Sequence, residues 1–447
     1  MPHRIVIVGA GLAGSLLACA LARDGHEVVV YERRGDPRSK GYVGGRSINL
    51  AISTRGLHAL RQVGLDDAVL ATAVRMPGRM IHPRGGATVY QPYSADPTRA
   101  INSVSRSGLN LTLMEAAARE PRASFRFDHL CVDVDPSQRR VTFRDRDGRT
   151  VVDHGDLVVG CDGAFSCIRS TLQRTEGFDY SQSYLGHGYK ELSIPPRSND
   201  GEWAMEPHAL HIWPRGGFMM IALPNQDRSF TCTLFLAHRG ESDDAPGFDR
   251  IHDDDDVRRF MLRWFPDAVP LMPTLLEDFR SNPVGAMVTI RCRPWHRGRI
   301  VLLGDGAHAV VPFYGQGANC AFEDCTALVE CLRRHAGDLD ATIATYEALR
   351  IDNANAIADL ALRNFVEMRD HTASRVFRMK KRLEHALHRI MPRTFVPLYD
   401  MISFSTIPYA EARDRARRQW RRVALAAIAA ALLLVAAITT WLATAHQ

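Results

Sequence analysis

The sequence lacks the features that mark secreted, zinc-binding and repeat proteins. Its nine cysteines include no pair at a zinc-ligand spacing, since neither Cys161 and Cys167 nor Cys320 and Cys325 match one. The apolar run Ile5–Val8 leads straight into glycines and is too short for the core of a signal peptide. We find no internal repeat and no linker rich in Pro, Gly or Ser. We therefore expect reduced thiols in a cytoplasmic chain, no bound metal, and domains that are intertwined.

A basic surface spread over the whole fold is also missing. The net charge is +6, and the stretch 411–422 alone contributes +4 of it. This distribution is not typical of a nucleic-acid-binding enzyme, whereas a short basic block beside an apolar run indicates a membrane surface. The 447 residues, 46% of them hydrophobic and 24% charged, exclude a mainly disordered chain and allow a large α/β core with additions.

The N-terminal segment has the pattern of a nucleotide-binding strand–helix–strand unit. Residues 4–8 predict a buried parallel strand, Gly9–Gly14 reads Gly-x-Gly-x-x-Gly, and the helix that follows ends at Gly25. A second strand, Glu27–Tyr31, then ends in Glu32. The three glycines suit a tight turn, the close approach of a pyrophosphate and close packing of helix on strand, and the acid suits a ribose hydroxyl. The combination predicts dinucleotide binding; a purely structural glycine turn is the alternative.

Two later strands each deliver a carboxylate to the edge of the sheet where open α/β folds bind ligands. One ends in Asp162-Gly163 and the other in Gly304-Asp305. The segment 312–319 then places glycines before a helix, where backbone N–H groups can face a ring or a phosphate. Because only one Gly-x-Gly-x-x-Gly is present, we expect a single resident dinucleotide.

The middle of the chain predicts a second, β-rich domain with antiparallel strands. The acids Asp253–Asp256 precede a predicted helix, Val257–Phe265, and suit its positive N-terminus better than they suit a metal. From about Ala321 the pattern is helical to the end. The strands expected to be antiparallel are Val141–Arg144, Thr150–Val152, Leu210–Trp213, Phe218–Leu223 and Ser229–Leu236.

The three nucleotide motifs, in this order, resemble the single-component FAD-dependent aromatic hydroxylases over nearly the whole soluble chain. The resemblance implies an α/β fold: a Rossmann-like FAD-binding domain intertwined with an antiparallel β-rich substrate domain, then C-terminal helices and a C-terminal membrane helix. It also implies that the Gly-Asp aspartate contacts the ribityl–phosphate region and that the Asp-Gly segment bridges the flavin and NADPH sites. The residues implied for cofactor binding are Gly9, Gly11, Leu12, Ala13, Gly14, Glu32, Arg33, Ala51, Arg106, Leu130, Asp162, Asp305, Gly317, Ala318 and Asn319.

Longer motifs resemble a branch of this family that hydroxylates an aromatic amino acid. They are Gly45–Ala51, Gly78–His82, Gln91–Tyr93, Ser103–Asn110, His187–Tyr189, Asn364–Arg369 and Met391–Tyr399. In that branch an arginine, two tyrosines and an asparagine hold the amino-acid carboxylate of the substrate. The corresponding residues here are Arg79, Tyr93, Asn364 and Tyr399. Ala318 departs from family members that carry Met in this loop, which puts the fit of the substrate beside the flavin in doubt.

The chemistry that the resemblance implies belongs to the cofactor. NADPH reduces FAD, O2 reacts with the reduced flavin, and a flavin hydroperoxide transfers OH to an electron-rich ring. The protein binds the amino-acid end, places the ring and excludes water, so no nucleophile triad or metal is required. His308, which follows the Gly-Asp motif, is explained as well by packing as by a role at the flavin.

The C-terminus predicts a membrane anchor. Residues 423–445 are 23 uncharged residues, about 34 Å of helix, and a hydrocarbon core is about 30 Å thick. Trp420 and Trp441 fall near the two interfaces, and the arginines before the segment favour the cytoplasmic side. We expect a protein held at the cytoplasmic face by membrane lipid, and a soluble, active chain if it ended at Tyr409. A helix packed on the protein or lying on the surface is the alternative.

Three other functions stay open from the sequence. The first is a membrane-associated flavin hydroxylase or epoxidase of a quinone precursor or lipid, for which Arg79 would have no carboxylate. The others are a flavin-dependent oxidase that needs no NADPH and a non-enzymatic flavoprotein sensor. The expected domains are 1–80, 100–178 and 290–343 for FAD, 81–99 and 179–289 for the substrate, 344–410 for C-terminal helices, 411–422 for a basic juxtamembrane segment and 423–445 for the membrane tail.

Overall fold

The computed structural model describes residues 2–40, 49–371 and 375–445. Gly45–Ile48, part of one motif named above, lie outside the described residues. The strands are β1 Arg4–Val8, β2 Glu27–Tyr31, β3 Leu50–Ile52, β4 Val74–Met76, β5 Gly78–Ile81, β6 Val89–Pro92, β7 Ile101–Val104, β8 Ala123–Arg126, β9 Leu130–Asp135, β10 Arg140–Arg144, β11 Thr150–His154, β12 Leu157–Gly160, β13 Asp179–Ile194, β14 Ala209–Pro214, β15 Met219–Pro224, β16 Phe230–Ala237, β17 Gly285–Arg293, β18 His296–Arg297 and β19 Ile300–Leu302.

Helices account for most of the remaining chain and for nearly all of its C-terminal third. The α-helices are α1 Leu12–Arg23, α2 Pro37–Lys40, α3 Thr54–Gln62, α4 Asp66–Ala71, α5 Arg106–Ala118, α6 Cys167–Leu172, α7 Asp254–Trp264, α8 Leu275–Ser281, α9 Asp305–His308, α10 Gly317–Arg334, α11 Leu339–Val366, α12 Arg375–Ile390, α13 Leu398–Ser403 and α14 Tyr409–Ala445. A π-helical turn, Glu367–His371, extends α11.

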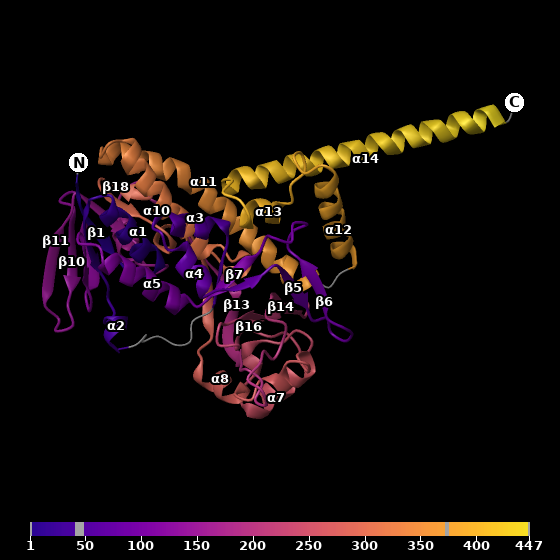
Figure 1. Cartoon of the computed structure of the whole chain (residues 1–447), viewed down its shortest axis with the longest axis horizontal. Helices are drawn as coiled ribbons and strands as arrows, with labels where there is room; N and C mark the ends of the chain where they lie inside the picture. The colour runs from indigo at the N-terminus through magenta and orange to yellow at the C-terminus, as the bar shows by residue number, and fades with distance from the viewer. Residues whose placement is uncertain (1, 41–48, 372–374, 446–447) are drawn as a thin grey trace.

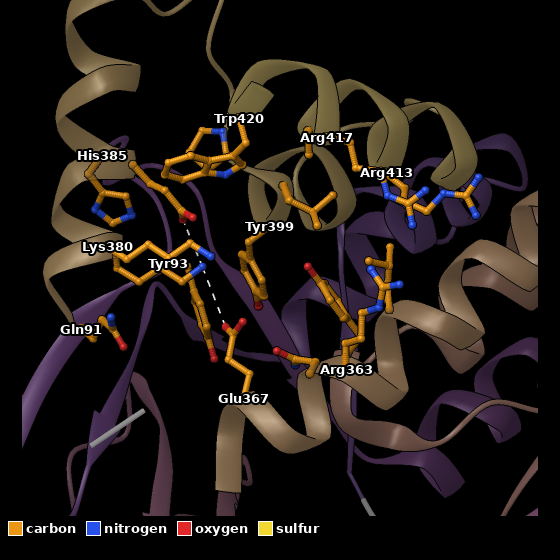
Figure 2. Close-up of a pocket in the computed structure, with 18 of the residues that line it drawn as sticks. Gln91, Tyr93, Arg363, Glu367, Lys380, His385, Tyr399, Arg413, Arg417 and Trp420 are labelled. Carbon is orange, nitrogen blue, oxygen red and sulfur yellow. Dashed lines mark hydrogen bonds and ion pairs between the residues drawn. The ribbon is translucent and has the colours of Figure 1, made fainter. Parts of the chain in front are cut away.

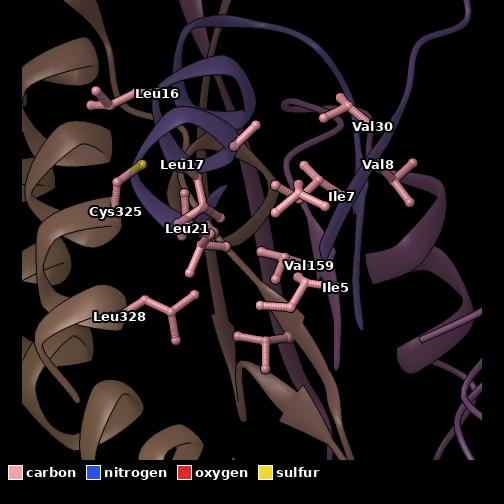
Figure 3. Close-up of a cluster of buried hydrophobic side chains, with 14 of the residues drawn as sticks. Ile5, Ile7, Val8, Leu16, Leu17, Leu21, Val30, Val159, Cys325 and Leu328 are labelled. Carbon is pink, nitrogen blue, oxygen red and sulfur yellow. The ribbon is translucent and has the colours of Figure 1, made fainter. Parts of the chain in front are cut away.

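The nucleotide-binding part is built on a six-stranded sheet in the order β18-β19-β12-β1-β2-β8 (Figure 1). β1 pairs in parallel with β2 on one side and with β12 on the other, so the predicted strand–helix–strand unit is confirmed. The strands are apolar because both faces are covered. Figure 3 shows α1 between the sheet and α10, where Leu17 and Leu21 of α1 and Leu328 of α10 are fully buried.

A second, seven-stranded sheet follows the order β17-β13-β16-β15-β14-β5-β6. The predicted meander is its antiparallel centre, β14-β15-β16, and the predicted hairpin is β10-β11 of a separate three-stranded sheet. α7 and α8 pack against the seven-stranded sheet through an apolar cluster that includes Trp213 and Trp264. The acidic run caps α7, since the Asp253 side chain accepts from the backbone N–H of Asp256. The α/β fold class is therefore confirmed, and the second sheet is antiparallel as predicted except where β5 pairs in parallel with β14.

The last helix, α14, begins on the body of the protein and continues beyond it (Figure 1). Ala412 and Ala416 are buried, and the Gln419 side chain holds Val396 by accepting from its N–H at 3.1 Å and donating to its carbonyl at 2.8 Å. The expected boundary at residue 410 therefore lies inside one continuous helix. A chain ending at Tyr409 would lose these contacts, so the expectation that it is soluble and active stays a prediction, and a chain ending after Arg422 would keep them.

Candidate active site

The glycine turn at the start of α1 is shaped by three different constraints. Gly9 has φ +104°, and a Cβ there would lie 2.4 Å from the Cys161 carbonyl oxygen. A Cβ on Gly14 would lie 1.9 Å from the Gly9 carbonyl oxygen, so helix and strand could not pack. A Cβ on Gly11 would meet no atom within 4 Å. The turn and its packing thus require Gly9 and Gly14, whereas Gly11 borders open space where a pyrophosphate can approach.

Glu32 at the end of β2 is held by the backbone beside this turn. One carboxylate oxygen accepts from Ala10 N at 2.9 Å and the other from Arg34 N at 3.0 Å. Two adjoining cavities, of about 450 and 500 Å³, share Gly11, Glu32 and Arg106 among their lining residues. The larger one extends from this turn to Pro312. A long cleft with an acid near one end matches the shape and the polarity that FAD requires.

Asp162 and Asp305 both line the larger of these cavities. Asp162 accepts from Cys167 N at 2.7 Å and from Ile168 N at 3.2 Å with one oxygen, and its other oxygen is buried without a hydrogen-bond partner among the described residues. Burial raises the pKa of this carboxyl, and the hydrogen bonds it accepts oppose the rise. Asp305 is exposed to the cleft. A buried acceptor without a partner suits a cleft that holds a ligand with hydroxyl groups.

The predicted cofactor residues at the start of α10 are placed differently. Asn319 is fully buried; its side chain accepts from Ser53 N at 3.0 Å and donates to the carbonyls of Ala51 and Gly315 at 2.8 and 2.7 Å. These bonds tie β3 to the loop, so only its backbone is left for a ligand. The predicted residues that line the two cleft cavities are Gly9, Gly11, Leu12, Glu32, Arg33, Arg106, Leu130, Asp162 and Asp305. Ala13, Gly14, Ala51, Gly317, Ala318 and Asn319 do not.

The four predicted substrate residues come together from four separate segments. A narrow cavity of about 90 Å³ lies between the second sheet and the loop Pro312–Gln316. A wider cavity of about 670 Å³, here called the vestibule, lies beyond it toward α12 and α14 (Figure 2). The residues that line both cavities are Arg79, Tyr93, Tyr314, Asn364 and Tyr399. They therefore form the boundary between an outer, charged space and an inner, apolar one.

The boundary residues are positioned by contacts within the protein. The Arg79 guanidinium donates from Nε to Gln91 Oε1 at 2.8 Å. The rings of Tyr93 and Tyr399 stack with their centroids 4.9 Å apart. The Tyr93 hydroxyl is buried and has no hydrogen-bond partner within the described part of the chain. Burial raises the pKa of Tyr93 and brings that of Tyr399 to about 12, so both phenols are protonated near neutral pH.

Asn364 offers a ligand a different group from the one we expected. Its amide nitrogen donates to the Phe313 carbonyl at 2.6 Å and to Met368 Sδ at 3.4 Å. Both amide hydrogens are used within the protein, so the carbonyl oxygen is the group that remains. An acceptor suits an ammonium better than a carboxylate.

Comparisons with known proteins show the family of this chain. A model of the FAD binding domain family matches residues 3–361. Kynurenine 3-monooxygenase of Myxococcus xanthus is 49% identical over 407 residues, which cover 91% of this chain and 86% of that protein. The chain belongs to the kynurenine 3-monooxygenase family. The mosquito Anopheles gambiae has a member that is 43% identical over 424 residues, covering 94% of this chain and 85% of that protein.

Solved structures show the same fold at lower identity. The tetrameric form of 2-methyl-3-hydroxypyridine-5-carboxylic acid oxygenase has a TM-score of 0.67 at 21% identity, over 88% of this chain and 98% of that one. PqsL of P. aeruginosa has a TM-score of 0.65 at 20% identity, over 83% of this chain and 97% of that one. The chain is therefore an FAD-dependent aromatic monooxygenase with the predicted fold, and the prediction of FAD and NADPH agrees with its family.

Our sequence reasoning missed two residues at the site of this family member. Gln91 belongs to one of the motifs, but the sequence does not show that it is the partner of Arg79. Tyr314 belongs to the glycine-containing segment before α10, and the sequence does not show that it lines both cavities. The signal for Gln91 was its place two residues before Tyr93, because alternate residues of a strand share a face. Tyr314 gave no signal of its own, since its contact with Tyr399, 5.8 Å between ring centroids, joins distant segments.

His308 belongs to a buried cluster that could be mistaken for a metal site. Its Nε2 lies 2.5 Å from Asp324 Oδ2, and Cys320 completes a group of possible ligands. Arg350 already fills this place, donating from Nε to Asp324 at 2.6 Å and from Nη2 to Cys320 Sγ at 3.3 Å. Burial disfavours the His308 cation, but the facing Asp324 carboxylate outweighs it and raises the pKa of His308. The cluster is an ion-pair network that joins α9, α10 and α11.

Proposed function

We propose that the chain hydroxylates L-kynurenine to 3-hydroxykynurenine with NADPH and O2, a step of tryptophan catabolism toward quinolinate and NAD. The observation that carries this proposal is the boundary between the two cavities. A cation and two phenols meet there, next to an apolar space lined by Leu210, Ile221 and Phe235. A substrate with an aromatic ring and a zwitterionic amino-acid end fits this arrangement, with the ring in the apolar cavity and the charged end at the boundary.

Each boundary residue has a role toward the amino-acid end. Arg79 would pair with the carboxylate, because a planar guanidinium can bind it through two parallel hydrogen bonds. Gln91 would hold that guanidinium in plane. Tyr93 and Tyr399 would donate from their protonated phenols, and the Asn364 carbonyl oxygen would accept from the ammonium.

The inner cavity and the cleft would hold the ring and the cofactor next to each other. Pro312 lines both the inner cavity and the larger cleft cavity, so the two spaces meet at this loop. FAD, reduced by NADPH, supplies the activated oxygen, while the protein holds the cofactor through the turn at Gly11, through Glu32 and through Asp305. The apolar lining would exclude water from the reacting ring.

We further propose that the enzyme works at the cytoplasmic face of a membrane. α14 is long and apolar enough to cross a bilayer, and its most apolar stretch is not buried in the protein. The arginines at its base favour the cytoplasmic side. This location also suits the rival substrate class, a lipid or quinone precursor, so the substrate has to be tested directly.

NADPH oxidation by the full-length protein, with and without L-kynurenine, tests the proposed function. We expect oxidation that depends on kynurenine and yields one hydroxylated product per NADPH. Oxidation that kynurenine does not stimulate, combined with turnover of an isoprenoid quinone precursor, would support the rival substrate. NADPH-independent oxidation of kynurenine would instead identify an oxidase.

A further inference from the structure

The helix α12 has an apolar face that no described part of the chain covers. Met379, Leu383 and Ile390 are 67%, 47% and 76% exposed. Their spacing of four and seven residues places them, with Ala386, on one stripe of the helix. Exposed large apolar side chains aligned on one helix face mark a surface that contacts something apolar.

The opposite face of α12 forms a wall of the vestibule. Lys380, Lys381, Glu384 and His385 line that cavity together with Trp420 of α14 (Figure 2). The Lys380 ammonium lies 5.4 Å from the centre of the Trp420 ring. The apolar stripe therefore faces away from the body, while the inner face of the same helix borders the space outside the proposed substrate residues.

The residues that line the vestibule show which part of α14 lies opposite α12. That lining runs along α14 from Arg413 to Ala424, which is already inside the predicted span 423–445. Trp420 precedes Val423 by three residues, about 4.5 Å of helix. Figure 1 shows α12 lying across the direction of α14 near the place where α14 leaves the body. If α14 spans a bilayer, α12 lies at the level of the lipid head groups.

The charged residues beside the apolar stripe favour a lipid surface over a protein as its partner. Arg382 and Arg389 are exposed on one flank of the stripe, and Lys380 on the other. Cations beside an apolar stripe are typical of helices that lie in the interface of a membrane with anionic lipids. A protein-covered face would more often be flanked by residues of both signs.

We propose that α12 is an interfacial membrane helix: its apolar stripe lies in the head-group and acyl boundary of the bilayer that α14 spans, and its inner face walls the substrate vestibule. The proposal rests on the membrane location proposed above. It gives the protein a second membrane contact, and it makes that contact part of the access route to Arg79 and Tyr399.

Depth-dependent fluorescence quenching tests this proposal in the full-length FAD-loaded protein. Ile390→Cys and Leu383→Cys would be labelled with bimane and reconstituted in vesicles of phosphatidylcholine and phosphatidylglycerol. Leu262→Cys on α7, whose native side chain is 55% exposed, is the matched control away from the membrane. Leu433→Cys reports the span itself. The unsubstituted protein gives the background, because its cysteines are buried or half-buried.

We expect the labels at 390 and 383 to shift to the blue and to be quenched by nitroxide lipids at a depth of about 5–10 Å. The label at 433 should be quenched by deep nitroxides, and the label at 262 by none. Quenching at 433 without quenching at 390 and 383 would refute the role of α12 but leave the anchor intact. Quenching at none of the positions would refute both. Shielding of 390 that persists in detergent and grows with protein concentration would identify a second copy of the chain as the partner, against the proposal.

Discussion

Replacement of Arg79 by alanine gives the sharpest test of the substrate site. Arg79 is half-buried at the boundary of the two cavities, and its Nε is held by Gln91 at 2.8 Å. Its loss would remove a charge-assisted hydrogen bond to the kynurenine carboxylate from a partly buried place. Such a bond contributes about 1.5–3 kcal/mol, which corresponds to a roughly ten- to more than hundredfold weaker affinity.

The assay has to separate substrate binding from the state of the cofactor. We expect Arg79→Ala to raise the Kd of kynurenine by that factor, measured by titration of the flavin absorbance, while the flavin-to-protein ratio stays at the wild-type value. Arg79→Lys should recover little, because an ammonium cannot form the two parallel bonds. Arg75→Ala is the matched control: Arg75 is exposed on the nearby strand β4 and donates to the Pro97 and Thr98 carbonyls.

Two results would refute the reasoning. An unchanged Kd in Arg79→Ala would show that the carboxylate is bound elsewhere. An equal loss in Arg79→Ala and Arg75→Ala would show a general electrostatic effect rather than a contact. Kynurenine without its carboxylate should bind the wild type weakly and lose little more in Arg79→Ala.

Four further outcomes follow from the structure. Gly11→Val should fold, since a Cβ there would meet no described atom within 4 Å, but it should be purified with much less flavin; full flavin occupancy would contradict the cofactor assignment. A chain ending after Arg422 should be soluble and keep kynurenine-dependent activity, whereas one ending at Tyr409 should melt at a lower temperature. Asp324→Asn should lower the free energy of unfolding by about 3–5 kcal/mol in denaturant titrations, because buried His308 would lose its carboxylate partner and buried Arg350 would keep only Glu323. The pKa of His308 is raised in the folded protein, so its charge contributes fully to stability below pH 6.5, and this contribution is lost as the pH rises through the folded pKa. The free energy of unfolding should therefore fall with pH in this range, and His308→Asn should make this dependence weaker.

The part of the fold that could be predicted from the sequence is the part whose constraints are local. β1 and β2 begin and end at the predicted residues, because an apolar run between polar residues and a glycine turn determine them within a few positions. The Asp253 cap was also predictable, since a helix N-terminus favours an acid at that position. These features need no knowledge of distant segments.

The candidate site could be predicted only through motifs, and its internal contacts could not. Nothing in local periodicity brings Tyr93 to Tyr399, which lie about three hundred residues apart in sequence and stack in the structure. The hydrogen bond from Asn364 to the Phe313 carbonyl was equally hidden, so the sequence could not show which group of the Asn364 amide is left for a ligand. The side-chain partners of His308, Asp324 and Cys320, lie on another helix, α10, which is why packing and catalysis could not be separated at that residue.

The basic segment 411–422 shows what composition alone leaves open. Its arginines predict a juxtamembrane segment, and in the structure this segment also belongs to the body of the protein: Gln419 pairs with both backbone groups of Val396, and Trp420 packs edge-on against Phe395. α14 therefore lines the vestibule before it reaches the candidate membrane span. If that span crosses a bilayer, as we propose, one helix carries both the vestibule wall and the anchor, and the depth of the protein at the membrane determines where the vestibule opens. A truncation that ignores this would then be expected to change both substrate access and anchoring.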